Sequence, residues 1–220
     1  MVSGATRGIG RAVAERLLAA GCQVSAGVRD ASRVPAGAVG FDYDANRQGS
    51  AAGWVGGTVA RFGRVDALVN AAGINPRASL LEGPDECFQD LWTVNAMGPI
   101  QVIRAAWPHL VASKEGRVIN IASLSGKRVR NDNLGYAMSK FAVMALTQEV
   151  RRLGWDHGIR ATALCPGFVD TDMTAHVTKW PPEQMSRPED LALLAETLLR
   201  LPNTASVAEL LVNCRHEDTL

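Results

Sequence analysis

Short apolar runs and longer helix-like stretches follow one another along the chain, and their periods predict strands and helices in turn. Runs rich in Val, Ile and Ala have the continuous hydrophobic character of buried strands. These runs are Cys22–Val28, Val65–Asn70, Arg117–Ala122, Arg160–Cys165 and Val207–Asn213. The helical stretches between them are Ile9–Ala20, Ala45–Arg61, Asp85–Val111, Tyr136–Trp155 and Pro188–Leu201. Because such strands need cover on both faces, the pattern predicts an α/β fold with a doubly wound parallel sheet in three layers.

A single domain is expected over residues 1–220. This length suits one hydrophobic core, and no repeat or low-complexity linker divides the chain. Only Met1 and Val2 precede a glycine-rich turn, so the first strand is expected to be a stub whose upstream residues are missing. Because the turn begins so close to Met1, no signal peptide is expected.

Composition excludes several classes of partner. The net charge is +1, and Lys and Arg are scattered, which argues against nucleic acid or an anionic membrane. No segment approaches the roughly 18 apolar residues that span a bilayer. The four histidines and four cysteines lack metal-ligand spacing, so we expect no metal site. The cysteines are expected to be free buried thiols in a reducing cytoplasm; they are Cys22, Cys87, Cys165 and Cys214.

The glycine-rich turn is the first candidate functional site. It runs from Ser3 to Gly10 and contains Gly4, Gly8 and Gly10. Glycines permit positive φ and let the backbone approach a pyrophosphate, while the following helix offers free N–H groups to it. Glycine-rich turns also occur only to bend a chain, but the strand–turn–helix context favours the phosphate site.

Tyr136 and Lys140 lie four residues apart at the start of a predicted helix and therefore share one face. A tyrosine has a pKa of about 10 and needs roughly 4 kcal/mol of phenolate stabilisation to act as a base near neutrality. One ammonium at about 4 Å supplies close to that energy at intermediate dielectric. The pair alone is common on helices, so its assignment depends on the residues around it.

Two polar residues strengthen the assignment. Ser123 follows a predicted strand, where a hydroxyl can stabilise charge that develops on a substrate oxygen. Asn95 lies inside a predicted helix next to Pro99, which indicates a local distortion that can hold a water. From the residues alone, an ordinary turn serine and a buried structural asparagine remain open alternatives.

Taken together, these motifs resemble the compact short-chain dehydrogenase/reductase family. The glycine spacing, Asn70–Gly73, Asn95, Ser123, the Tyr136–Lys140 pair and Pro166-Gly167 appear in that family's order, from residue 1 to about Thr171 and more loosely to Leu211. The resemblance implies a Rossmann fold and a NAD(P)-dependent oxidoreductase acting on a carbonyl compound or secondary alcohol. It implies a catalytic tetrad in which Ser123 orients the carbonyl, Tyr136 moves the proton, Asn95 relays it through water, and Lys140 lowers the tyrosine pKa and binds the nicotinamide ribose.

The resemblance also implies a set of cofactor-binding residues. They are Gly4, Thr6, Arg7, Gly8, Ile9 and Gly10 in the turn, Arg29 after the second strand, Asp42 and Tyr43 beside the adenine, Asn70, Ala71, Ala72 and Gly73 along the cofactor, Tyr136 and Lys140, and Pro166, Gly167, Val169 and Thr171 at the nicotinamide.

NADP(H) is favoured over NAD(H), which remains possible. In the family an acidic residue at the end of the second strand selects NAD, whereas Val28 stands there in this chain and Arg29 follows it. Arg29 and Arg7 can pair with a 2′-phosphate. The alternatives are that both arginines are solvated, or that Asp30 binds the ribose.

The sequence leaves the substrate open. A lid over about residues 172–186 is expected, with an apolar wall from Met173, Val177 and Trp180, although these side chains can instead pack the lid onto the body. Departures from the family are Ala71, Cys165 and the missing Asp-Gly-Gly close. A homodimer or homotetramer is implied by the resemblance. A catalytically silent NADP(H)-binding sensor is the alternative function.

Overall fold

A computed structural model describes residues 1–216, and its core is a parallel sheet of seven strands in the order β3-β2-β1-β4-β5-β6-β7. The strands are β1 Val2–Ser3, β2 Ser25–Val28, β3 Val39–Asp42, β4 Ala67–Asn70, β5 Arg117–Ile121, β6 Arg160–Pro166 and β7 Glu209–Val212. The α-helices are α1 Gly8–Ala19, α2 Ser50–Phe62, α3 Asp85–Leu91, α4 Gly98–Ser113, α5 Leu134–Gly154 and α6 Pro188–Arg200.

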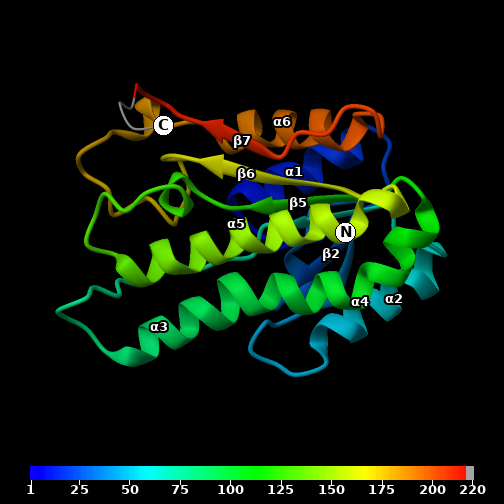
Figure 1. The fold of residues 1–220 in the computed structure, drawn as a ribbon, viewed down its shortest axis with the longest axis horizontal. Coiled ribbons are helices and arrows are strands. Elements are labelled where there is room, and N and C mark those ends of the chain that lie inside the picture. The colour runs from blue at the N-terminus through cyan, green and yellow to red at the C-terminus, as the bar shows by residue number, and fades with distance from the viewer. Residues whose placement is uncertain (217–220) are drawn as a thin grey trace.

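Helices cover both faces of this sheet, which confirms the predicted three-layer Rossmann fold (Figure 1). One core joins α1 and α6 to the strands through residues such as Val13 and Leu191. The other joins α2, α4 and α5 through Trp54, Leu110 and Val150. The arrowheads of β5, β6 and β7 point the same way in Figure 1, so the loops that follow these strands gather at one edge. That edge holds the candidate site.

The first strand is as short as the sequence indicated, yet it occupies the centre of the sheet. Val2 pairs with Ala26 of β2 on one side and with Val69 of β4 on the other. Two paired residues are enough to aim the glycine turn at the carboxyl edge, because both neighbouring strands hold the stub in register.

Several predicted boundaries were wrong. The edge strand β3 was not expected at all. The strand predicted over Cys22–Val28 begins at Ser25, and the helix predicted from Ala45 begins at Ser50.

The long helix expected over Asp85–Val111 is interrupted by the π-helical segment η2, Trp92–Met97. Pro99 has no N–H to donate to the carbonyl of Asn95, four residues earlier, so a regular ladder cannot pass this point. The predicted distortion beside Asn95 is therefore present.

Candidate active site

A cavity of about 1440 Å³ follows the carboxyl edge of the sheet from the glycine turn to the segment expected to form a lid, about residues 172–186. Loops after β1 to β6 line it, together with the first turns of α5. Its size and place are those of a dinucleotide and substrate cleft in a doubly wound sheet.

The glycine turn has a shape that only glycine permits. Gly4 has a φ of +69°, and a Cβ there would lie 2.8 Å from the Cα of Ala72. A Cβ on Gly10 would lie 2.5 Å from the carbonyl oxygen of Gly4. Arg7 caps α1 without any side-chain hydrogen bond to the first-turn N–H groups. The backbone thus forms a cradle with free donors, which fits a pyrophosphate.

Most of the predicted cofactor residues line the cavity, but Asp42 and Asn70 are not on its wall. Asp42 is exposed and forms an ion pair with Arg47 at 2.6 Å. Asn70 is buried in the sheet and donates through Nδ2 to Oδ1 of Asn120 at 2.8 Å. Through this hydrogen bond Asn70 joins β4 to β5 and so stabilises the sheet.

Tyr43 does line the cavity, with its ring packed 5.1 Å from that of Trp54. The turn that follows β3 contributes Asp44, Ala45 and Asn46 to the same wall. Burial raises the pKa of Tyr43 to about 12, so its hydroxyl stays protonated at neutral pH.

Three arginines reach the cavity near the glycine turn, one more than the sequence indicated. Arg29 and Arg7 both line it, and Arg7 forms an ion pair with Asp172 of the lid at 3.2 Å. The additional residue is Arg33, in the short 3₁₀ helix η1, Ala31–Arg33. Its only signal in the sequence is a position four residues after Arg29. The Asp30 carboxylate accepts hydrogen bonds from the amide and hydroxyl of Ser32, which turns it toward its own loop.

Ser123, Tyr136 and Lys140 lie together on the cavity wall. Ser123 lies two residues after the end of β5 and caps the 3₁₀ helix η3, Leu124–Gly126, accepting from the amide of Ser125 at 3.0 Å. Lys140 is buried and donates from Nζ to the carbonyl of Ile121 at 2.8 Å. Its Nζ lies 5.5 Å from the centroid of the Tyr136 ring. Elements separated in sequence thus bring a hydroxyl, a phenol and an ammonium to one place.

Burial shifts both titrating groups toward their neutral forms. It raises the pKa of Tyr136 to about 12, and a side-chain hydrogen bond with Ser123 acts in the opposite direction. It lowers the pKa of Lys140 to about 8. Lys140 therefore loses its proton before Tyr136 does, and the pair alone does not produce a phenolate near neutrality. We expected Lys140 alone to lower the tyrosine pKa far enough. In this structure a further positive charge beside the phenol is required.

Asn95 does not line the cavity; its buried side chain holds the loop after β4. Its Oδ1 accepts from the amide of Ile74 at 2.9 Å, and its Nδ2 donates to the carbonyl of Ile74 and to Ser139 Oγ, both at 3.0 Å. These hydrogen bonds match the alternative that the sequence left open, in which Asn95 is a buried structural residue. A proton relay at Asn95 remains a prediction.

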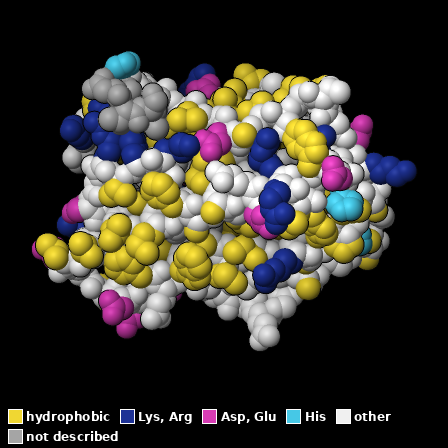
Figure 2. All heavy atoms as spheres, in the orientation of Figure 1, with side chains coloured by type: hydrophobic (Ala, Val, Ile, Leu, Met, Phe, Trp, Pro, Cys, Tyr) yellow, Lys and Arg dark blue, Asp and Glu magenta, His cyan; other side chains and the backbone are white. Residues whose placement is uncertain are grey.

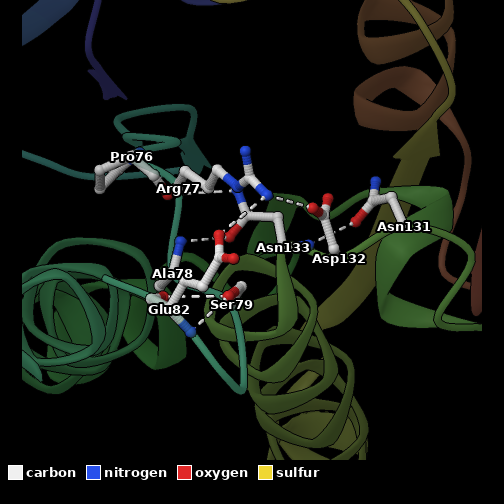
Figure 3. A network of polar contacts seen from close by, with 8 residues as sticks. All are labelled: Pro76, Arg77, Ala78, Ser79, Glu82, Asn131, Asp132 and Asn133. Atoms are coloured by element: carbon white, nitrogen blue, oxygen red, sulfur yellow. Dashed lines mark hydrogen bonds and ion pairs between the residues drawn. The ribbon is translucent and has the colours of Figure 1, made fainter. Parts of the chain in front are cut away.

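Asn133 is a supporting residue that the sequence analysis missed. It caps α5, and its Oδ1 accepts from the amides of Tyr136 at 3.4 Å and Ala78 at 3.0 Å. Its Nδ2 donates to the carbonyl of Pro76, and the neighbouring Asp132 pairs with Arg77 (Figure 3). This network ties the loop after β4 to the turn that carries Tyr136. An Asn three residues before a helical tyrosine is the capping signal that could have revealed it.

The lid contributes both apolar and charged groups. Met173, Val177 and Trp180 line the cavity as expected, and Lys179 and His176 do so too.

All four cysteines are free, but only Cys165 is buried, so the expectation of buried thiols was wrong for the other three. Within residues 1–216, no helix has the length and apolar character that a membrane crossing requires. The same residues contain no group of three or more His, Cys, Asp or Glu that could hold a metal ion.

Comparison with known proteins agrees with this geometry. A family model described as short chain dehydrogenase matches residues 1–182. An agropine synthesis reductase from Rhizobium rhizogenes is 37% identical over 99% of this chain and 52% of its own length. The chain thus spans about half the length of that relative. An L-fucose dehydrogenase from Mus musculus is 32% identical over 100% of this chain and 82% of its own.

Solved structures extend the likeness. A dehydrogenase/reductase from Sinorhizobium meliloti 1021 superposes with a TM-score of 0.88 at 30% identity, covering 97% of this chain and 92% of its own. An alcohol dehydrogenase from Thermococcus sibiricus, complexed with 5-hydroxy-NADP, gives a TM-score of 0.86 at 27% identity, covering 96% and 94%.

Proposed function

The chain belongs to the short-chain dehydrogenase family, and we propose that it transfers a hydride between NADP(H) and a small carbonyl compound or its secondary alcohol. The observation that carries this proposal is the meeting of Ser123, Tyr136 and Lys140 in a cavity that begins at the glycine cradle. A binding module without activity has no need of a buried phenol beside an ammonium, so the same observation argues against a silent sensor.

Each side chain has a role that follows from its position. A bound nicotinamide cofactor would supply the hydride and, when oxidised, a positive charge. Ser123 would donate to the substrate oxygen and stabilise its developing charge. Tyr136 would give its proton to that oxygen, or take it in the reverse direction. Lys140, fixed by the carbonyl of Ile121, would stabilise the phenolate and bind the ribose.

The proposal is tested by following NADPH oxidation with a panel of aldehydes, ketones and diketones. We expect turnover of some members and none in the absence of a carbonyl compound. NADPH binding without turnover of any member would favour the sensor instead.

Cofactor preference is tested at Arg29, an exposed cation on the cavity wall beyond β2. Wild type is expected to favour NADPH over NADH in kcat/KM. Arg29→Ala should lose roughly 1.5–3 kcal/mol of that preference, the worth of a charged hydrogen bond. Arg64→Ala is the control, because Arg64 pairs with Asp66 away from the cavity and should leave the preference unchanged. A wild type that favours NADH would contradict the prediction.

We also propose that the chain forms a homodimer or homotetramer through the helices that carry the site. Figure 2 shows hydrophobic side chains spread over the face on which α3, α4 and α5 run. Trp92, Phe141 and Trp155, on or next to these helices, are 49%, 43% and 46% exposed. Burying such groups favours a symmetric assembly.

Light scattering at micromolar concentration should give a multiple of 23.5 kDa. Phe141→Glu should shift the mass toward the monomer, because it places a charge on the exposed apolar face. A wild-type monomer would exclude this assembly.

A further inference from the structure

Tyr136 is carried by the first turn of α5, and this turn rests on Ala78 in the loop after β4 (Figure 3). The amide of Ala78 donates to Oδ1 of Asn133 at 3.0 Å, and its carbonyl accepts from the amide of Gly135 at 2.9 Å. Asn133 is the N-cap residue of α5, and Gly135 directly precedes Tyr136. We call Ala78, Asn133 and Gly135 the Ala78 contact. It joins the turn that carries the phenol to a part of the chain that lies more than fifty residues earlier.

The absence of a side chain at Gly135 allows this close approach. A Cβ on Gly135 would lie 2.7 Å from the Cβ of Ala78, whereas carbon atoms in contact normally stay about 3.5–4.0 Å apart. Both residues are buried. The Cβ of Ala78 is bonded directly to the backbone, so it cannot move aside unless the loop or the turn moves with it.

Asn133 uses both ends of its side-chain amide in this region. Its Oδ1 also accepts from the amide of Tyr136 at 3.4 Å, which is the hydrogen bond of an ordinary helix cap. Its Nδ2 donates to Oδ1 of Asn75 at 2.8 Å and to the carbonyl of Pro76 at 3.1 Å. A cap alone has no need of the bonds to the loop, so Asn133 both caps α5 and ties it to that loop.

The same loop forms part of the wall along which the cofactor would lie, because residues 71–75 line the cavity. The Ala78 contact therefore fixes the position of the Tyr136 phenol relative to the place of the nicotinamide and the reacting carbonyl. Proton transfer is sensitive to this position, since a misplacement of about 1 Å can cost about 100-fold in rate.

We propose that Asn133 and Gly135 are positioning residues for Tyr136, which act through the Ala78 contact to set the place of the phenol beside the substrate carbonyl. Neither side chain takes part in the proton transfer. The inference rests on the proposed function, because it concerns the alignment of the proton donor in that reaction.

Gly135→Ala tests the contact at its closest point. The new methyl group should push the first turn of α5 away from Ala78 and lower kcat about 10- to 100-fold, while the KM for NADPH changes little. Alanine favours a helix by roughly 1 kcal/mol over glycine, so a weaker helix cannot explain such a loss. The double variant Gly135→Ala/Ala78→Gly moves the methyl group to the other side of the contact. It should recover most of the lost kcat.

Asn133→Ser separates the cap from the tie to the loop. Serine caps helices about as well as asparagine, but it is too short to reach Asn75 and Pro76. A capping role alone predicts wild-type kcat for this variant, whereas the positioning role predicts a loss of about tenfold or more.

A control for the loss of a cap is available at the start of α6. The carboxylate of Asp190 accepts from the amide of Arg187 at 3.0 Å, and Asp190 does not line the cavity. Asp190→Ala should lower the free energy of unfolding and leave kcat unchanged.

A spectroscopic measurement tests the inference without any turnover. The chain has two tyrosines, Tyr43 and Tyr136, so protein that contains fluorotyrosine should give two fluorine NMR resonances, which Tyr136→Phe assigns. Gly135→Ala and Asn133→Ser should each shift the Tyr136 resonance and leave that of Tyr43 in place. The double variant should return the Tyr136 resonance toward its wild-type position.

The outcomes separate this inference from the proposed function. Wild-type kcat in both Gly135→Ala and Asn133→Ser would overturn the positioning role and leave the hydride transfer standing. An unchanged Tyr136 resonance in both variants would overturn it whatever the activity. If the wild type reduces no carbonyl compound, the proposed function fails, and the resonances still show whether the Ala78 contact sets the place of the phenol.

Discussion

Tyr136→Phe is expected to lower kcat by several orders of magnitude while leaving NADPH affinity nearly unchanged. The substitution removes one oxygen and keeps the ring beside Lys140. It removes the proton donor, whose general acid–base role is worth about 10²–10⁴ in rate. Turnover is measured with whichever carbonyl compound the wild type reduces, and NADPH affinity by fluorescence titration.

A neighbouring variant controls for damage to α5. Met138 lies two residues away on the same helix, is 51% exposed and does not line the cavity. Met138→Leu should therefore turn over like wild type. Near-normal turnover of a folded Tyr136→Phe protein would contradict proton transfer through this residue.

Much of the fold was predictable because its strands are continuous apolar runs. A strand that is apolar on both faces is stable only in the interior of a sheet that is covered on both sides. The edge strand β3 lacks this signal, since Val39 and Phe41 are only partly buried and Gly40 stands between them. Gly40 is required there because a Cβ would lie 2.6 Å from the carbonyl oxygen of Ala31. Close packing against a short loop is not visible in hydrophobic periodicity.

The candidate site was predictable where residues follow a fixed spacing. Tyr136 and Lys140 share a helical face, and Ser123 ends a strand, so the three positions follow from local geometry. Arg33 gives no signal beyond its position four residues after Arg29, because a charged loop residue gives the same pattern whether it faces solvent or a cavity. Only the three-dimensional structure places it on the wall.

The effect of Lys140 on the pKa of Tyr136 also could not be judged from the sequence alone. Nζ of Lys140 lies 5.5 Å from the centroid of the Tyr136 ring, so the ammonium is close to the phenol. For two unit charges about 5.5 Å apart at an effective dielectric of about 20, the attraction is about 3 kcal/mol, or about two pKa units. Starting from a pKa of about 12, this leaves Tyr136 well above neutrality. The remaining decrease of the Tyr136 pKa must come from another positive charge.

Lys140→Met is expected to reduce kcat/KM by at least about 100-fold, the rate equivalent of that 3 kcal/mol. Methionine keeps the unbranched apolar stem but removes the ammonium that donates to Ile121 and faces Tyr136. Turnover is compared with wild type under saturating NADPH, so that a weakened ribose contact does not mask the effect. Wild-type turnover in this variant would contradict a role for the ammonium.

The same variant should change how stability depends on pH. Burial lowers the pKa of Lys140 from 10.5 to about 8, so between these values the unfolded chain holds a proton that the folded chain has lost. Stability that Lys140 costs below pH 8 is therefore recovered as pH rises toward 10.5, by about 3 kcal/mol in all. The lost hydrogen bond to Ile121 contributes nearly equally at each pH and cancels from this trend. Urea unfolding of both proteins from pH 7 to 10.5 should show wild type gaining about 3 kcal/mol relative to Lys140→Met. Parallel pH profiles would mean that the ammonium is solvated in the folded protein.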